Sequence, residues 1–210
     1  MPTPNAGQAS LKQKEVDSVD NIFFDTSKLK YMGKNVIIGK TVRIRHPELV
    51  SIDDYSIIDD FTYISSELEI GKFCHIASNS VILGGGGKGK CIFEDLTGCA
   101  PGARIITASD DYDGAIAGPN APEEFQRDAY GGLVHIKNYS ILGTNTVVMP
   151  DVTIEVGAVT SAMTLVRKNL EPWTIYGGNP ARRIGPRDKE RGEASVAAFW
   201  KAYEEAGGEL

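Results

Sequence analysis

The stretch "LEIGKFCHIASNSVI", which runs from Leu68 to Ile82, places isoleucine at positions 70, 76 and 82. An amphipathic helix repeats its apolar side chains at spacings of three and four residues, and an isolated strand repeats them at two. A spacing of six indicates neither element alone. It is typical of a short strand followed by a corner, repeated along the chain.

The register of six extends well beyond this stretch. Sixteen of its seventeen positions are apolar, where a hydrophobic content of 41% would supply about seven. These positions are Ile38, Ile44, Ile52, Ile58, Ile64, Ile70, Ile76, Ile82, Phe93, Cys99, Ile105, Ile136, Leu142, Val148, Ile154, Thr160 and Val166. A second column lies two residues earlier and holds mostly small side chains, such as Ser56, Thr62 and Ala103. Because residues two apart in a strand point to the same side, both columns face inward.

One large and one small inward residue in every six predict a flat strand and a bend. Three such sides close a triangular coil of about 18 residues. Glycine or aspartate follows the inward aliphatic residue at 38–40, 52–54, 58–60 and 70–72, as corners favour. The sequence therefore predicts an all-β fold, a parallel β-helix of nearly six stacked coils, and the spacing leaves the hand of the coil open.

Composition narrows the classes of function. The chain has 210 residues and a net charge of −6, which argues against a general nucleic-acid-binding protein. No run approaches 18 apolar residues, so we expect no membrane span. The odd number of cysteines, three, does not suggest a disulfide framework, and a cytoplasmic location is the expectation.

The repeat, together with "WTIYGGNPARRI" at 173–184, resembles the hexapeptide-repeat acyltransferases over roughly residues 33–186. The most similar branch holds maltose and galactoside acetyltransferases and sugar-nucleotide acyltransferases. The resemblance implies a left-handed parallel β-helix, a homotrimer with active sites between subunits, and acetyl-CoA bound in grooves between neighbouring prisms. Residues 1–32 are then a polar leader and short cap, and residues 187–210 a C-terminal helix with an apolar stripe.

Three interruptions of the period must leave the prism as loops. Two extra residues lie near "RHPELV", five extra residues near "GGGGKGK", and about twenty-five extra residues form the inserted loop 107–133. Loops this long in compact domains are usually functional or disordered. The resemblance implies that the loop 107–133 reaches over the neighbouring subunit and shapes the acceptor pocket.

Histidines are the candidate bases, because acyl transfer needs a group that takes a proton near neutral pH. His75 stands between the inward residues Cys74 and Ile76, so it points outward and is the leading catalytic candidate. His135 also points outward and is a weaker candidate, and His46 precedes Pro47 in a predicted turn. The cysteines fall on inward positions and are expected to be buried and inert.

The resemblance also exposes a departure from the family. Maltose- and galactoside-type enzymes carry their catalytic histidine where this chain has Asp110. We expect Asp110 to assist His75, or to hold an amine substrate that reacts with little help. Asn79 matches a sugar-binding asparagine of the galactoside enzymes, and Lys88 and Asp111 are further candidates for substrate binding.

CoA binding has six candidate residues. Matched to the family, Thr144, Ala162, Arg167, Lys168 and Arg182 fall on CoA-contact positions, and Pro180 is a neighbour that could pack on adenine. Arginine and lysine suit its phosphates. No metal is expected, since the three histidines lack the close pair that a zinc carbonic anhydrase on this fold requires.

These observations predict an acetyl-CoA-dependent O- or N-acetyltransferase that acts on a sugar, with a nucleotide-linked amino or deoxy sugar for cell-surface polysaccharide as the expected acceptor. Two alternatives stay open. An antibiotic acetyltransferase would use the same fold and cofactor with another acceptor, and a non-catalytic trimeric scaffold would bind sugars without reacting.

Overall fold

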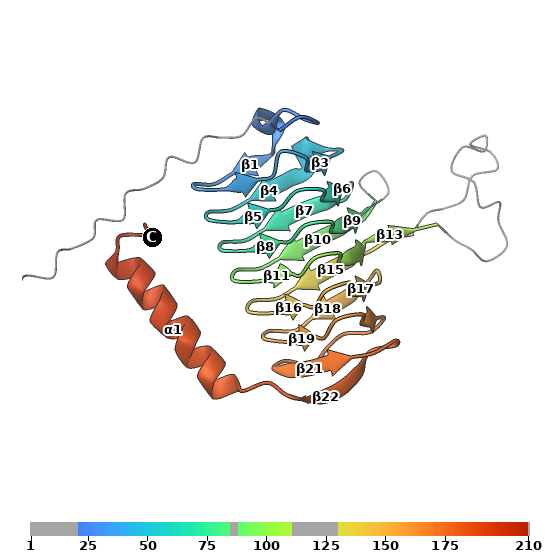
Figure 1. Cartoon of the computed structure of the whole chain (residues 1–210), viewed down its shortest axis with the longest axis vertical. Helices are drawn as coiled ribbons and strands as arrows, with labels where there is room; N and C mark the ends of the chain where they lie inside the picture. The colour runs from blue at the N-terminus through green and yellow to red at the C-terminus, as the bar shows by residue number, and fades with distance from the viewer. Residues whose placement is uncertain (1–20, 85–87, 111–129, 210) are drawn as a thin grey trace, which may run out of the picture.

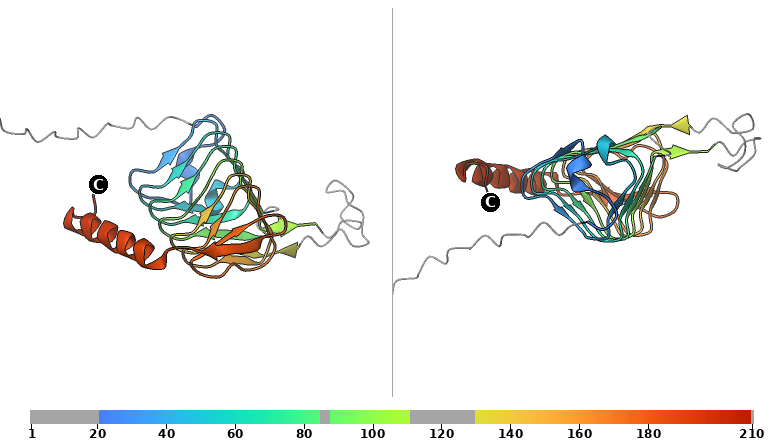
Figure 2. Two further views of the ribbon diagram at one scale, coloured as in Figure 1. Left: turned by 60° about the horizontal axis from the view of Figure 1, so that its bottom comes forward. Right: turned by 90° about the horizontal axis from the view of Figure 1, so that it is seen from above.

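The computed structural model describes residues 21–84, 88–110 and 130–209. These form a prism of stacked coils with one helix alongside (Figure 1), and the coils are triangular when viewed from above (Figure 2). Short strands line its three sides in parallel sheets, which we call sheets A, B and C. Two 3₁₀ turns, η1 (Thr26–Lys28) and η2 (Pro47–Leu49), lie near its amino-terminal end.

Each coil contributes one strand to each sheet in turn. Sheet A has the order β1 (Tyr31–Met32), β4 (Val50–Ile52), β7 (Glu67–Ile70), β10 (Lys90–Phe93), β15 (Leu133–Ile136) and β18 (Val152–Ile154). Sheet B has β2 (Ile37–Ile38), β5 (Ile57–Ile58), β8 (His75–Ile76), β11 (Gly98–Cys99), β16 (Ile141–Leu142), β19 (Val159–Thr160), β21 (Thr174–Gly177) and, antiparallel at its end, β22 (Arg182–Pro186). Sheet C has β3 (Arg43–Ile44), β6 (Tyr63–Ile64), β9 (Val81–Leu83), β12 (Arg104–Ile106), β17 (Val147–Val148) and β20 (Leu165–Val166).

The predicted fold is confirmed: the chain is an all-β, left-handed parallel β-helix of about six coils with a short carboxy-terminal helix. The register of six explains the pairing, because Ile58, Ile76, Cys99 and Leu142 pair in succession along sheet B. Of the seventeen predicted inward positions, all but Ile38 are buried.

The column of small inward residues is also buried, and its hydroxyl groups are hydrogen-bonded. Ser56 Oγ donates to Gly71 O at 2.7 Å, Ser80 Oγ to Ala77 O at 2.6 Å, and Ser140 Oγ to Glu155 O at 2.8 Å. A buried hydroxyl without a partner would be costly, so these bonds let small polar residues occupy the core.

The corners explain how the prism turns. At the corner between sheets A and B, residues such as Tyr55 (φ 60°), Phe73 (φ 56°) and Trp173 (φ 49°) adopt the left-handed backbone conformation. The corner between sheets B and C repeats it with Phe61 (φ 62°) and Asn79 (φ 59°). Bulky residues rarely adopt this conformation, which costs roughly 1–2 kcal/mol per residue.

All three interruptions leave the prism at the corner between sheets C and A. Each follows a strand of sheet C, namely β3, β9 or β12, and precedes a strand of sheet A. The longest begins and ends with a two-stranded antiparallel ladder, β13 (Ala108–Ser109) and β14 (Tyr130–Gly131), which projects from this corner (Figure 2). Residues 1–20, 85–87 and 111–129, which include most of the predicted leader and loop, lie outside the described residues.

Helix α1 (Lys189–Glu205) packs along the corner between sheets A and B. Its predicted stripe is confirmed for the aromatic residues: the Phe199 ring lies 4.9 Å from that of Phe73, and the Tyr203 ring lies 5.2 Å from it. Asp188 caps the helix by accepting from Arg191 N at 3.0 Å. No helix in the described ranges is long and apolar enough to cross a membrane.

Candidate functional site

The three outer faces differ in charge. The described strands of sheet C contain no aspartate or glutamate, and Arg43 and Arg104 point outward from them. Sheet A instead presents a ladder in which Lys90 Nζ lies 3.1 Å from Glu67 Oε1 and 2.6 Å from Glu69 Oε1. In a chain with a net charge of −6, the face of sheet C is thus suited to anionic ligands.

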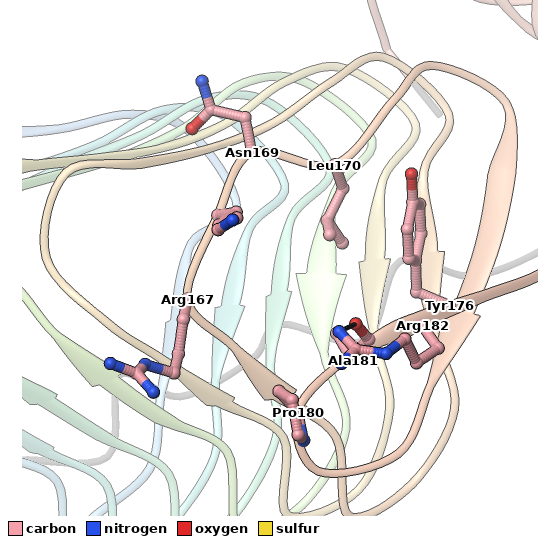
Figure 3. A pocket seen from close by; sticks show the side chains of 8 residues that line it. Arg167, Asn169, Leu170, Tyr176, Pro180, Ala181 and Arg182 are labelled. Carbon is pink, nitrogen blue, oxygen red and sulfur yellow. Dashed lines mark hydrogen bonds between the residues drawn. The ribbon is translucent and has the colours of Figure 1, made fainter.

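A groove of about 490 Å³ lies at the carboxy-terminal end of the prism (Figure 3). Its walls combine basic side chains with apolar ones, as a ligand with phosphates and an aromatic base requires. Four of the six predicted cofactor residues lie here. The lining residues are Arg167, Lys168, Asn169, Leu170, Tyr176, Pro180, Ala181 and Arg182.

The remaining two predicted cofactor residues lie beside this groove, on the corner between sheets B and C. Met163 N donates to Thr144 O at 2.8 Å, so Thr144 and Ala162 belong to adjacent coils of that corner. Strand β20 leads from Ala162 to Arg167, and Leu165 N donates to Gly178 O at 3.0 Å. An exposed strip therefore runs from the groove onto the corner.

Asn79 lies on the same corner, two coils nearer the amino-terminal end than Asn145. Its carbonyl oxygen accepts a hydrogen bond from Arg104 Nη1 at 2.7 Å, and Gly102 O accepts from the same nitrogen at 2.7 Å. Arg104 is not among the site residues predicted from the sequence. Its outward position on β12 is a signal that the six-residue register could have supplied.

Asp110 and Lys88 lie at the corner between sheets C and A, where the inserted loop leaves the prism. Asp110 directly follows β13, and the backbone of Lys88 lies against Gly131 of β14, where a Cβ atom would meet Lys88 O. The two candidates therefore occupy the base of the same loop. Asp111 lies outside the described residues.

His75 lies on the outer face of sheet B, with Nε2 2.8 Å from Asp59 Oδ2. Its side chain is 54% exposed, and Ile57 and Gly98 are its neighbours in the sheet. The β13–β14 ladder projects from the corner opposite this sheet (Figure 2). Asp110 directly follows β13, so a single chain does not bring His75 and Asp110 together.

The other two histidines also meet carboxylates. His135 Nε2 lies 2.7 Å from Glu94 Oε1 on sheet A, and Glu94 Oε2 accepts from Asn138 N at 3.0 Å and from Asn138 Nδ2 at 2.7 Å. His46 precedes η2 and lies 3.5 Å from Glu48. His135 is thus held as firmly as His75, on a different face.

The cysteines are buried and free, as predicted. Burial raises the pKa of Cys74, raises that of Cys91 well above its usual value, and raises that of Cys99 to about 11. Thiols held in the neutral form are poor nucleophiles.

No protein-family model matches the chain. It is 30% identical over 176 residues to a dTDP-4-amino-4,6-dideoxy-D-glucose acyltransferase of Escherichia coli, spanning 82% of this chain and 90% of the relative. A chloramphenicol acetyltransferase of Escherichia coli is 32% identical over 124 residues, which is 59% of this chain and 53% of that protein.

A similar solved structure is a serine variant of AntD, an N-acyltransferase from Bacillus cereus, in complex with dTDP-4-amino-4,6-dideoxyglucose and coenzyme A. Its TM-score is 0.78 at 31% identity, and the match covers 87% of this chain and 100% of that one. AntD has also been solved with dTDP and 3-hydroxybutyryl-CoA. A hexapeptide-repeat acetyltransferase of Vibrio cholerae, with a TM-score of 0.53 at 18% identity, shares the fold.

Proposed function

From the premise that this chain belongs to the hexapeptide-repeat acyltransferases, we propose that it transfers an acyl group from acyl-CoA to the amino group of a nucleotide-linked amino-deoxy sugar. The observation that carries this proposal is the basic groove, which gathers into one cavity three residues matched to CoA contacts, Arg167, Lys168 and Arg182, and their neighbour Pro180. The Escherichia coli relative is named for such a sugar, and a structure of AntD holds one.

The donor would lie along the strip described above. Arg167, Lys168 and Arg182 would hold the phosphates of acyl-CoA by charge-assisted hydrogen bonds, and Pro180 would pack on the adenine. The exposed backbone around Thr144 and Ala162 would hydrogen-bond the amides of the pantetheine arm. When bound, acyl-CoA supplies a thioester that is reactive toward amines.

The acceptor would lie between this strip and the inserted loop. Asn79, Lys88, Asp110 and Asp111 are its proposed contacts. An aspartate beside a sugar amine would hold the ammonium by charge and orient the amine once a proton has left.

His75 is the proposed base, and Asp59 would orient it, since a carboxylate on one ring nitrogen fixes the imidazole and leaves the other nitrogen to take the proton. Because His75 lies on β8, four strands of sheet B away from β21, where Tyr176 lines the groove, the proposed site needs a second copy of the chain. A homotrimer, the assembly that the resemblance implies, would supply it. We place the enzyme in the cytoplasm, where its free thiols stay reduced.

A release assay tests the function. The purified protein is mixed with acetyl-CoA or 3-hydroxybutyryl-CoA and one of three acceptors: dTDP-4-amino-4,6-dideoxyglucose, dTDP-glucose or chloramphenicol. Release of free CoA thiol with the amino sugar alone supports the proposal. Release with chloramphenicol alone would favour the second candidate, an antibiotic acetyltransferase, to which the partial matches point. Binding of the sugar without release would identify a scaffold.

The two histidine dyads give a matched pair of variants. His75→Ala should lower kcat by about 10²- to 10⁴-fold, the usual contribution of a general base. His135→Ala removes a similar imidazole–carboxylate contact from another face and should leave kcat within about threefold. The reverse ranking would assign the role of base to His135. Full activity in both variants would mean that neither histidine is the base, and Asp110 or the substrate amine itself would then account for the loss of the proton.

A further inference from the structure

The corner between sheets B and C carries an exposed aromatic residue that the proposed function does not use. Phe61 is 66% exposed and has a φ of 62°. Other aromatic residues with this backbone conformation, Tyr55 and Phe73, are covered at their own corner by Tyr203 of helix α1. Among the described residues, no aromatic ring packs on Phe61. A strained backbone that presents a bare ring to solvent suggests a binding role.

Arg104 provides a second, independent observation on the same corner. Its Nη1 donates to Asn79 O and Gly102 O at 2.7 Å each and to Ala103 O at 3.3 Å, which fixes the plane of the guanidinium group. In the part of the chain that the structure describes, no hydrogen bond uses its Nη2 or Nε. A guanidinium held in place with donors to spare is suited to phosphate oxygens.

Phe61 and Arg104 lie within reach of one ligand. Asn79 N donates to Asp60 O at 3.2 Å and Gly102 N to Ser78 O at 3.0 Å, so Phe61, Asn79 and Gly102 stand on three successive coils. Coils are about 4.8 Å apart. Arg104 bridges the second and third of these coils, and Phe61 stands on the first. The distance from the Phe61 ring to the guanidinium group is therefore about the distance from the base of a nucleotide to its phosphates.

We propose that this corner binds the nucleoside diphosphate part of the acceptor, with Phe61 stacked on the base and Arg104 donating to the diphosphate. The proposal rests on the proposed function for the identity of the ligand. It would place the sugar over the outer face of sheet C, between Arg104 at one end of β12 and Asp110 beyond the other. The donor strip begins further along the same corner, at Thr144, so the two substrates would meet end to end.

The test is the dissociation constant of dTDP, measured by calorimetry with the full chain at low and at high salt. Arg104→Gln should weaken dTDP binding by about ten- to hundredfold and flatten its salt dependence, because a charged contact to phosphate is lost. Phe61→Ala should weaken binding by about tenfold and keep the salt dependence, because only stacking is lost.

Matched controls come from the same surfaces. Arg43→Gln is the control for Arg104→Gln, because it removes an equal charge from sheet C three coils away. Met163→Ala is the control for Phe61→Ala, because Met163 is also exposed, lies on the same corner and has a similar positive φ. Neither should change dTDP binding. If Arg104→Gln folds poorly, Arg104→Lys should keep part of the salt-dependent affinity.

Unchanged dTDP binding in both Phe61→Ala and Arg104→Gln would overturn the proposal. The proposal would also be overturned if Arg104→Gln and Arg104→Lys lowered the melting temperature, the CoA affinity and the dTDP affinity to the same extent. Arg104 would then only stabilise the corner. Failure of acyl transfer by the wild type is a separate result. It would contradict the proposed function, whereas nucleotide binding at this corner would still be tested by these variants.

Discussion

At the scale of single residues, the corners depend on paired glycines and aspartates in neighbouring coils. Asp60 Oδ1 accepts from Thr41 N at 2.8 Å and from Thr41 Oγ1 at 2.7 Å. A Cβ atom on Gly39 would lie 2.6 Å from Asp60 N, so only glycine fits beside it. Gly33 with Asp54 and Gly71 with Asp95 repeat this arrangement.

Asp60→Ala should destabilise the fold by about 1–2 kcal/mol, because it leaves the Thr41 donors without their acceptor. Asp60→Asn keeps an acceptor oxygen and should cost clearly less. Urea unfolding at neutral pH measures both. Equal stability of Asp60→Ala and the wild type would show that water replaces the carboxylate at no cost.

Acid should weaken the same corners. The backbone hydrogen bond from Thr41 holds the pKa of Asp60 below its usual value, and that from Lys34 does the same for Asp54. Groups with a lowered folded-state pKa contribute their full stability above the unfolded value of about 3.9, and that contribution is lost as pH falls through the lower folded value. Asp60→Asn should therefore lose less stability than the wild type below about pH 4. Parallel curves would contradict this assignment.

The three thiols give a simple check of the core. Because all three are buried and their pKa values are raised, an aromatic disulfide reagent should leave them unmodified in the native protein. In denaturant all three should react. Rapid reaction of any thiol in the native state would show that the prism opens locally.

At the scale of elements, helix α1 and the β13–β14 ladder lie at different corners of the prism, so the helix leaves the corner between sheets C and A uncovered (Figures 1 and 2). Arg187 fastens the start of the helix: its Nη1 donates to Tyr139 O at 2.6 Å and Gly157 O at 3.0 Å, and its guanidinium lies 5.4 Å from the Trp173 ring centroid. The helix therefore acts as a brace for the corner between sheets A and B.

Phe199→Ala should release this brace. The lost ring packs on Phe73, Trp200 and Tyr203, and removing a half-buried aromatic group costs roughly 2–4 kcal/mol. Hydrogen exchange should then be faster in α1 and unchanged in the strands of sheet C. Lys201→Ala on the exposed side of the helix is the control. Faster exchange throughout the prism would mean that the helix belongs to the cooperative core.

The sequence predicted the prism well because its period is local and its core is regular. Residues such as Ile76 and Ile105 needed only their spacing to be placed. The register could indicate that Arg104 points outward, but the proposed roles of Phe61 and Arg104 could not be predicted, because they depend on contacts between coils. His75 shows the same limit: spacing indicated that it points outward, but not that it lies across the prism from Asp110.

At the scale of the whole molecule, the proposed site is shared between copies. His75→Ala and a double Arg167→Ala, Lys168→Ala variant should each be nearly inactive alone. Co-expressed in equal amounts as mixed trimers, they should recover about a quarter of the wild-type rate, because about one interface in four would combine an intact base with an intact groove. No recovery would place the whole site in one chain.

The most direct test of acyl transfer is the mass of the product. The protein is incubated with acetyl-CoA and an equimolar mixture of dTDP-4-amino-4,6-dideoxyglucose and dTDP-glucose, and both sugars are analysed by mass spectrometry. We predict that the amino sugar gains one acetyl group, that dTDP-glucose is unchanged, and that the groove variant makes no product. Two unchanged sugars in the presence of wild-type protein, or acetylation of dTDP-glucose alone, would contradict the account.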